Sequence, residues 1–180
     1  MTGSYDPPDS RPARDLAYGG LFGAAALALP SLFHLLHLGH FLMPMYIPLM
    51  ALPFFVGARV AGVVGLVIPM LSSVLTGMPP LFPPVAPVMA VEIGLMAGSL
   101  ALLRRRYPAF PVVGHVVPVL LAGRVVNTVL LFAASAVLSL PAAFVAGISF
   151  ISGWPGVLLM IAILPGVDRV RRSIESRRVS

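Results

Sequence analysis

The chain has 180 residues, of which 58% are hydrophobic and only 10% are charged, whereas charged residues make up about a quarter of a soluble domain. This composition predicts an integral membrane protein without a soluble domain. The absence of cysteine excludes disulfides, thiolate metal sites and thiol nucleophiles. The net charge of +6 does not indicate nucleic-acid binding, because the arginines that produce it flank the apolar stretches.

The apolar stretches predict an all-α bundle of six transmembrane helices. A helix of about 20 apolar residues crosses a hydrocarbon core of roughly 30 Å. In chain order the expected spans cover about residues 16–38, 41–56, 58–76, 84–103, 112–138 and 143–167.

Two of the six spans are irregular, and two polar segments flank the set. The second span is short and carries three prolines, and the sixth is interrupted by Gly-Trp-Pro-Gly at residues 153–156. That interruption predicts either one kinked helix or a short piece followed by a helix with Pro155 in its first turn. Residues 1–15 are expected to be a disordered cytoplasmic lead, residues 16–168 the membrane domain, and residues 169–180 a basic cytoplasmic tail.

The arginines predict the orientation of this bundle. All twelve basic residues are arginines, and the connections at about residues 39–45, 77–83 and 139–142 carry no charge. Cytoplasmic loops collect basic residues, so both termini are expected on the cytoplasmic side of a prokaryotic plasma membrane. Eleven arginines lie on that side: Arg11, Arg14, Arg59, Arg104, Arg105, Arg106, Arg169, Arg171, Arg172, Arg177 and Arg178.

The twelfth arginine, Arg124, lies inside the fifth span, and Glu92 lies inside the fourth. At 1.5 Å per residue, Glu92 is ~12 Å below the outer surface and Arg124 ~18 Å above the inner end of its span, which is nearly the same depth. We expect the two to pair, because each alone is expensive in lipid. They either line a polar cavity that opens outward, with Asn127 one turn above Arg124 on the same face, or only fix helix packing.

Three histidines lie at i, i+3 and i+6 near the outer end of the first span: His34, His37 and His40. Imidazoles at helical spacing can bind a transition metal. However, these positions diverge around a straight helix, so no metal site is predicted. The alternative is a set of interfacial histidines, one of which forms a hydrogen bond with a substrate. His115, near the inner end of the fifth span, is also expected at the membrane interface.

Small residues recur along the first span at fourfold spacing, at Gly20, Ala24 and Ala28. Faces of this kind allow close approach of helices in lipid. The face is expected either to pack inside the six-helix bundle or to dock to a second membrane protein.

The sequence contains no nucleotide-binding loop of the G-x-x-x-x-G-K-[ST] type. It also lacks the H-E-x-x-H, paired-aspartate and serine–histidine arrangements of intramembrane proteases. We therefore expect neither an enzyme nor a bound cofactor, and another chain must supply the energy for any uphill transport that is driven by nucleotide hydrolysis.

Six sequence segments together resemble a known family. They read H-F-L-M-P-M-Y-I-P-L, F-V-G-A-R-V-A-G-V-V-G, I-P-M-L-S-S-V-L-T-G-M-P-P-L, P-V-A-P-V-M-A-V-E-I-G, G-R-V-V-N and G-W-P-G-V-L-L-M-I-A-I-L-P. The chain resembles the substrate-binding S component of an energy-coupling factor (ECF) vitamin transporter over about two thirds of its length. The T-G-M-P-P turn, followed by Glu92, is the most specific part of the resemblance.

The resemblance implies a six-helix membrane bundle without ATPase activity of its own. Such a protein would sit in membrane lipid and bind a small vitamin or vitamin precursor on the outer side. It would then associate with a transmembrane coupling protein and two ATPase subunits. The docking face of the family's first helix maps onto Ala24 and Ala28, next to Gly20.

The expected ligand cavity is roofed by the first outer connection and by residues 77–83. A cavity with both an acid and a base suits a zwitterionic or amide-rich heterocycle. A metal-uptake S component, which would begin with a metal-coordinating amino terminus, and a structural membrane protein are the alternatives. The expected substrate contacts are polar at Glu92, Arg124, Asn127 and His40, and apolar or stacking at Tyr46, Met78, Phe82 and Trp154.

Overall fold

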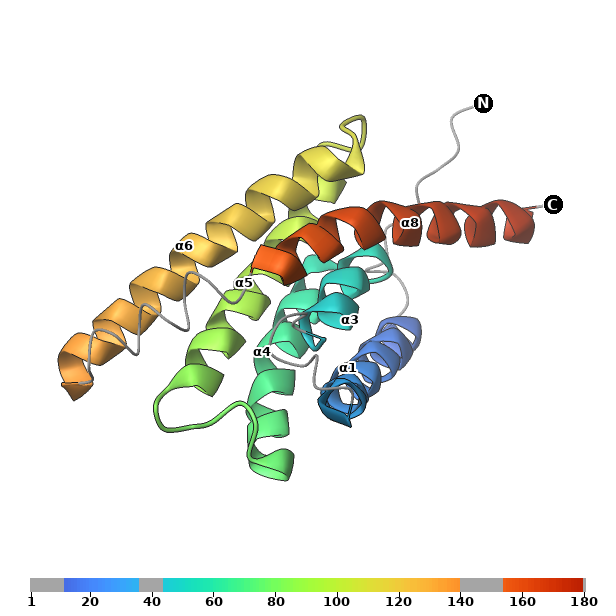
Figure 1. The fold of residues 1–180 in the computed structure, drawn as a ribbon. Coiled ribbons are helices and arrows are strands. Elements are labelled where there is room, and N and C mark those ends of the chain that lie inside the picture. Colours follow the sequence, from blue (N-terminus) through green and yellow to red (C-terminus); the bar gives the residue numbers. More distant parts are fainter. Residues whose placement is uncertain (1–11, 36–43, 140–153, 180) are drawn as a thin grey trace.

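A computed structural model describes residues 12–35, 44–139 and 154–179, and every regular element in these ranges is a helix (Figure 1). Figure 1 shows α5 between α4 and α6, with α8 crossing the bundle over the short α3. The elements are α1 (Pro12–Leu35), α3 (Tyr46–Ala51), the 3-10 turn η2 (Leu52–Phe54), α4 (Ala58–Thr76), α5 (Val85–Arg106), α6 (Val112–Leu138) and α8 (Trp154–Val179).

Three of these helices, α4, α5 and α6, are long and apolar enough to cross a membrane. The predicted bounds of the third and fifth spans are confirmed, and the fourth runs three residues further, through its arginine cluster. Glycine and proline residues mark the ends of these helices. Gly77 ends α4 with a φ of 74°, a left-handed conformation that favours glycine. Pro84 and Pro111 directly precede α5 and α6. The full count of six spans and the cytoplasmic termini stay predictions.

The described part of the predicted second span differs from a membrane-crossing helix. It holds only the six residues of α3 followed by η2, and six residues of helix extend about 9 Å. Proline cannot donate the backbone hydrogen bond that continues a helix, and this stretch carries Pro44, Pro48 and Pro53. The segment is instead buried among its neighbours, with Leu49, Met50 and Leu52 fully covered in the core.

The first and last helices extend further toward the chain termini than expected. α1 begins at Pro12, so residues 12–15 of the predicted disordered lead are helical. α8 begins at Trp154, with Pro155 in its first turn, and continues through the predicted tail to Val179. The earlier part of the predicted sixth span, residues 143–153, lies outside the described residues.

Glycines set the spacing of the central helices. A Cβ atom at Gly65 would lie 3.0 Å from the carbonyl oxygen of Ile93 and 3.1 Å from the Cα of Gly94. On the other side of α5, a Cβ at Gly123 would collide with the sulfur of Met96. Helix association in lipid depends on such van der Waals contact. These glycines therefore hold α5 tightly between α4 and α6.

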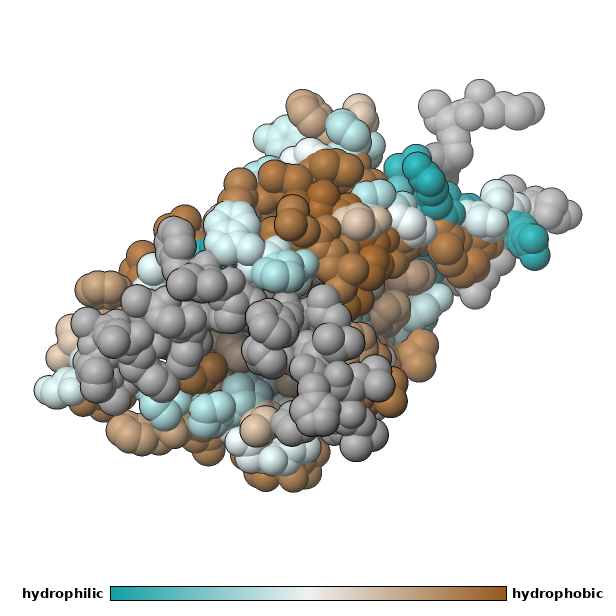
Figure 2. Space-filling model, in the orientation of Figure 1, coloured by the Kyte–Doolittle hydropathy of each residue, from teal (hydrophilic) through white to brown (hydrophobic). Residues whose placement is uncertain are grey.

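The outer surface of the bundle is largely apolar. Figure 2 shows hydrophobic side chains over much of the visible described surface, and hydrophilic residues toward the C-terminal half of α8. Exposed large side chains are frequent on α4 and α6, including Val63, Val74, Val125 and Phe132. An apolar surface of this extent is unusual for a soluble monomer, so it fits helices that face lipid.

Candidate functional site

Four predicted site residues meet in one cluster, which we call the Glu92 cluster: Tyr46, Glu92, Arg124 and Asn127. Glu92 is fully buried, and its Oε1 accepts a hydrogen bond from Nη2 of Arg124 at 2.5 Å. Its Oε2 accepts two more, from the Tyr46 hydroxyl at 2.6 Å and from Nδ2 of Asn127 at 2.7 Å. The predicted pairing of Glu92 with Arg124 is confirmed.

Helices α3, α5 and α6 bring these side chains together, and Tyr46 is the first residue of α3. Glu92 lies on α5, two residues before Gly94, where α5 is in close contact with α4. Arg124 and Asn127 are three residues apart on α6, so they share one helix face. Gly123, directly before Arg124, lies against α5. The glycine contacts on both sides of α5 therefore fix the depth and separation of the charged pair.

Tyr46 forms a hydrogen bond that the sequence did not indicate. Its ring was expected to provide apolar or stacking surface, and the guanidinium carbon of Arg124 does lie 5.9 Å from the ring centroid, within the range of a cation–π contact. The hydroxyl bond to Glu92 was not predicted. It joins residues 46 positions apart, so neither spacing nor periodicity could have indicated it.

The cluster balances one negative charge against one positive charge inside the bundle. The carboxylate accepts three hydrogen bonds, close to its capacity of about four lone-pair sites. Removing one partner of a buried pair typically costs about 3–5 kcal/mol, because the other charge is left uncompensated. The side chain of Arg124 is 12% exposed while that of Glu92 is completely covered. Arg124 is therefore the charged member of the cluster that retains exposed surface.

The remaining predicted substrate contacts do not take part in these hydrogen bonds. Met78 is 59% exposed, Phe82 70% and Trp154 41%. His40 lies outside the described residues, as does His37, and of His34 only the helical backbone is described. The predicted binding set thus divides into a polar group that the structure brings together and a set of exposed apolar residues.

The small-residue face of α1 is exposed. Gly20, Ala24 and Ala28 all lie on the outer side of the helix, and a Cβ at Gly20 would meet nothing within 4 Å. Internal packing uses a different set, in which a Cβ at Gly19 would lie 3.2 Å from Val64 and a Cβ at Gly23 2.9 Å from Ile68. Within the described residues, the predicted docking face is therefore available to a partner or to lipid.

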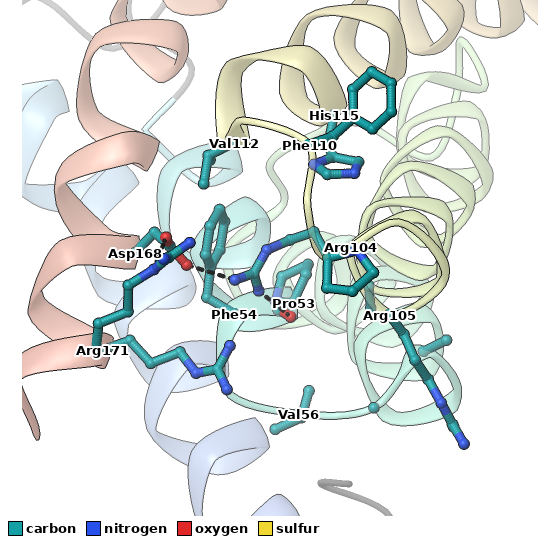
Figure 3. Close-up of a pocket in the computed structure, with 15 residues that line it drawn as sticks. Pro53, Phe54, Val56, Arg104, Arg105, Phe110, Val112, His115, Asp168 and Arg171 are labelled. Carbon is teal, nitrogen blue, oxygen red and sulfur yellow. Dashed lines mark hydrogen bonds and ion pairs between the residues drawn. The ribbon is translucent and has the colours of Figure 1, made fainter. Parts of the chain in front are cut away.

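A second polar centre lies at the arginine-rich end of the bundle and was not predicted. The Arg104 guanidinium donates to Asp168 Oδ1 at 2.5 Å and to the Pro53 carbonyl at 3.3 Å, and it stacks over the Phe54 ring at 3.9 Å (Figure 3). Arg172 also donates to Asp168, at 2.7 Å. Asp168, expected at the start of a cytoplasmic tail, is buried and ties α8 to α5.

This centre borders a cavity of about 290 Å³, which we call the arginine cavity. His115, on the first turn of α6, lines it and is only 4% exposed. Neither ring nitrogen of His115 has a hydrogen-bond partner among the described residues. A buried polar group without a partner costs about 1–3 kcal/mol. The sequence placed His115 and these arginines at the same end of the bundle, but it did not indicate that they share a cavity.

Comparison of the chain with models of protein families, with curated proteins and with solved structures gives no match. The family resemblance consequently rests on the segments of this sequence that carry it. The function is argued from those segments and from the two polar centres.

Proposed function

We propose that the chain is the substrate-binding S component of an ECF-type importer in a prokaryotic plasma membrane. The observation that carries this proposal is the Glu92 cluster, in which two predicted charged site residues and two polar ones converge inside the bundle. Ionisable residues at membrane depth are rare, face the protein interior, and commonly mark substrate pathways. Three described helices are long and apolar enough to cross a membrane, and two of them, α5 and α6, carry the charged pair.

Ligand capture would begin at the reachable edge of the cluster. Arg124 retains exposed surface, and its planar guanidinium suits a carboxylate or another acidic group of a ligand. The Asn127 amide both donates and accepts, which suits an amide-rich heterocycle. Glu92 orients both side chains through its hydrogen bonds and offsets the charge of Arg124. The ligand class is therefore a small vitamin or precursor with acidic and amide groups.

Energy for uptake would come from partner proteins. The sequence carries no nucleotide-binding loop, so a transmembrane coupling protein with two ATPase subunits would hydrolyse ATP. The exposed face at Gly20, Ala24 and Ala28 supports docking, because its small side chains let another helix approach closely. Capture and docking would then use different helices, α6 and α1.

A second candidate is a structural membrane protein in which the Glu92 cluster only holds helices together. The three hydrogen bonds that already engage the Glu92 carboxylate favour it. The two candidates differ in what Asn127 does. In a structural protein it serves folding alone, whereas in a binding protein it also contacts a ligand.

Native mass spectrometry of the purified chain tests the proposal. We expect a small molecule that co-purifies with the wild type and is absent from Asn127→Ala. The matched control is Ser135→Ala, since Ser135 is a half-buried residue of the same helix whose hydroxyl donates to the nearby carbonyl of Phe132. Folded Asn127→Ala protein that retains the molecule at the wild-type level would contradict the proposed site. Uphill uptake by the chain alone in proteoliposomes, without ATPase, would identify a secondary transporter instead.

A further inference from the structure

The arginine cavity is formed where four parts of the chain meet. The end of α5 contributes Arg104, α8 contributes Asp168 and Arg171, the first turn of α6 contributes His115, and η2 contributes Phe54. The arginine distribution assigns this end of the bundle to the cytoplasmic side. The cavity thus lies at the level of one membrane surface, apart from the Glu92 cluster, which is twelve residues up α5 from Arg104.

Positive charge dominates the lining of this cavity. Four arginines line it, Arg104, Arg105, Arg171 and Arg172, and among the described lining residues the one carboxylate is that of Asp168. Asp168 holds Arg104 and Arg172 in place through one oxygen each. Figure 3 shows the side chain of Arg171 beside this group, whereas Arg105 points away from it. A fixed group of guanidiniums with excess charge is suited to an anion, and in particular to phosphate oxygens.

His115 is a further polar residue in the lining of the cavity. It is buried, lines the cavity, and its two ring nitrogens find no partner in the described part of the chain. In Figure 3 its imidazole lies above the Arg104 side chain. Buried polar groups are nearly always hydrogen-bonded, so an unpartnered imidazole in a cavity indicates a ligand with a polar atom at that point.

The remaining walls are apolar, with Phe54, Val112 and Phe110 among them. Phe110 is also 63% exposed and sits next to the cavity on the connection between α5 and α6. A ligand that fits must therefore combine an anionic group with polar atoms beyond it and an apolar part. Basic pockets between membrane helices on the cytoplasmic side are suited to such headgroups.

From this geometry we propose that the arginine cavity binds a phosphate ester, with the phosphate at Arg104 and Arg171 and a further polar group of the ligand at His115. An anionic glycerophospholipid of the cytoplasmic leaflet and a soluble phosphate compound share this chemistry. The site is independent of the substrate site at Glu92 and would tie the inner end of the bundle to its membrane or to a phosphorylated metabolite.

The test uses the full chain in neutral detergent and three probes: short-chain phosphatidylglycerol, the matching diacylglycerol without phosphate, and inorganic phosphate. Thermal unfolding and native mass spectrometry report binding, because a ligand of the folded state raises its unfolding temperature. We expect phosphatidylglycerol to bind and diacylglycerol not to bind. Stabilisation by inorganic phosphate as well would identify the phosphate group alone as sufficient, whereas stabilisation by phosphatidylglycerol only would identify a lipid site.

Two variants and two controls separate the cavity from general surface charge. Arg171→Gln should weaken phosphatidylglycerol binding about ten-fold, as expected for the loss of one charge-assisted hydrogen bond. His115→Leu should weaken phosphatidylglycerol about ten-fold by the same measure and leave any inorganic phosphate binding unchanged. The controls are Arg106→Gln on α5 and Arg177→Gln on α8, arginines outside the cavity lining.

The controls should change binding by no more than about two-fold, since exposed charges contribute little and are screened. Equal losses in Arg171→Gln and Arg177→Gln would overturn the proposal in favour of nonspecific surface attraction. Equal retention of phosphatidylglycerol and diacylglycerol would also overturn it. His115→Leu removes an unpartnered polar group and should fold, so its unliganded unfolding temperature should not fall below that of the wild type.

Discussion

Gly65 on α4 lies directly against Gly94 on α5: a Cβ atom at Gly65 would come within 3.1 Å of both the nitrogen and the Cα of Gly94. The obstructing atoms belong to the backbone and cannot turn aside as a side chain would. The whole helix must shift to admit a methyl group. Because Glu92 is two residues from Gly94, this contact also sets where the charged pair forms.

Gly65→Ala should therefore destabilise the protein by about 1–3 kcal/mol, the usual cost of overpacking a filled interior. Gly166→Ala is the matched control, since Gly166 is also helical and a Cβ there would meet nothing within 4 Å. The control should be stabilising by about 0.5–1 kcal/mol, because glycine is the poorer helix former. Thermal unfolding in detergent measures both. The same sign for both changes would mean that α4 and α5 are not in close contact.

Removal of Arg124 tests the charged pair. Arg124→Ala should cost about 3–5 kcal/mol, because it leaves Glu92 buried without its cationic partner. The double variant Glu92→Gln, Arg124→Ala should be less destabilised than the sum of the two single changes, with a coupling of about 0.5–3 kcal/mol for groups in contact. A double-mutant cycle by thermal unfolding checks this. Additive losses would show that the two side chains do not interact.

The charged pair could be predicted from the sequence, because a membrane leaves so few options. Two opposite charges at the same depth on consecutive helices must meet or remain costly. The bounds of α4 and α6 were also predictable, since Gly77 and Pro111 mark their ends locally. In each case a strong local or environmental constraint acts on a few residues.

The rest depended on contacts between distant parts of the chain. The apolar character of residues 41–56 predicted a span, whereas prolines limit its described helix to six residues that pack into the core. Burial in protein and burial in lipid select the same apolar residues, so composition cannot separate them. The Arg104–Asp168 bond joins positions 64 apart, and only the folding of α8 back over the bundle brings them together.

The orientation can be tested by single cysteines, because the chain contains none of its own. Thr76, Ser139 and Ser173 are all exposed, at the ends of α4 and α6 and on α8. A cysteine at Thr76 or Ser139 should react with a membrane-impermeant maleimide in intact cells, while one at Ser173 should react only after lysis, since the arginines predict a cytoplasmic location for that side. Labelling of Ser173→Cys in intact cells would reverse the orientation.

The exposed face of α1 allows docking to be separated from binding. Ala24→Trp places a bulky side chain on the outer surface, so the isolated protein should keep its stability and any co-purified ligand. If the chain is the proposed S component, uptake in cells that contain a coupling protein and its ATPases should be lost, because the bulky group prevents close helix contact. Ala26→Trp is the contrasting change, since Ala26 is 0% exposed and its replacement should destabilise the bundle itself. Normal uptake by a stable Ala24→Trp protein would place the docking surface elsewhere.

Asp168 offers an internal comparison, because one carboxylate binds two arginines in different surroundings. The Arg104 side chain is 13% exposed and that of Arg172 is 69% exposed. Arg172→Gln should cost at most about 1 kcal/mol, as for other exposed pairs on a helix. Arg104→Gln should cost about 1–3 kcal/mol, since it leaves buried polar groups with a lost partner and also removes the contact over the Phe54 ring. Thermal unfolding of the two variants without added lipid measures the difference. Equal losses would mean that Asp168 is not buried against α5, and that the arginine-rich end of α8 is held to the bundle only by surface charge.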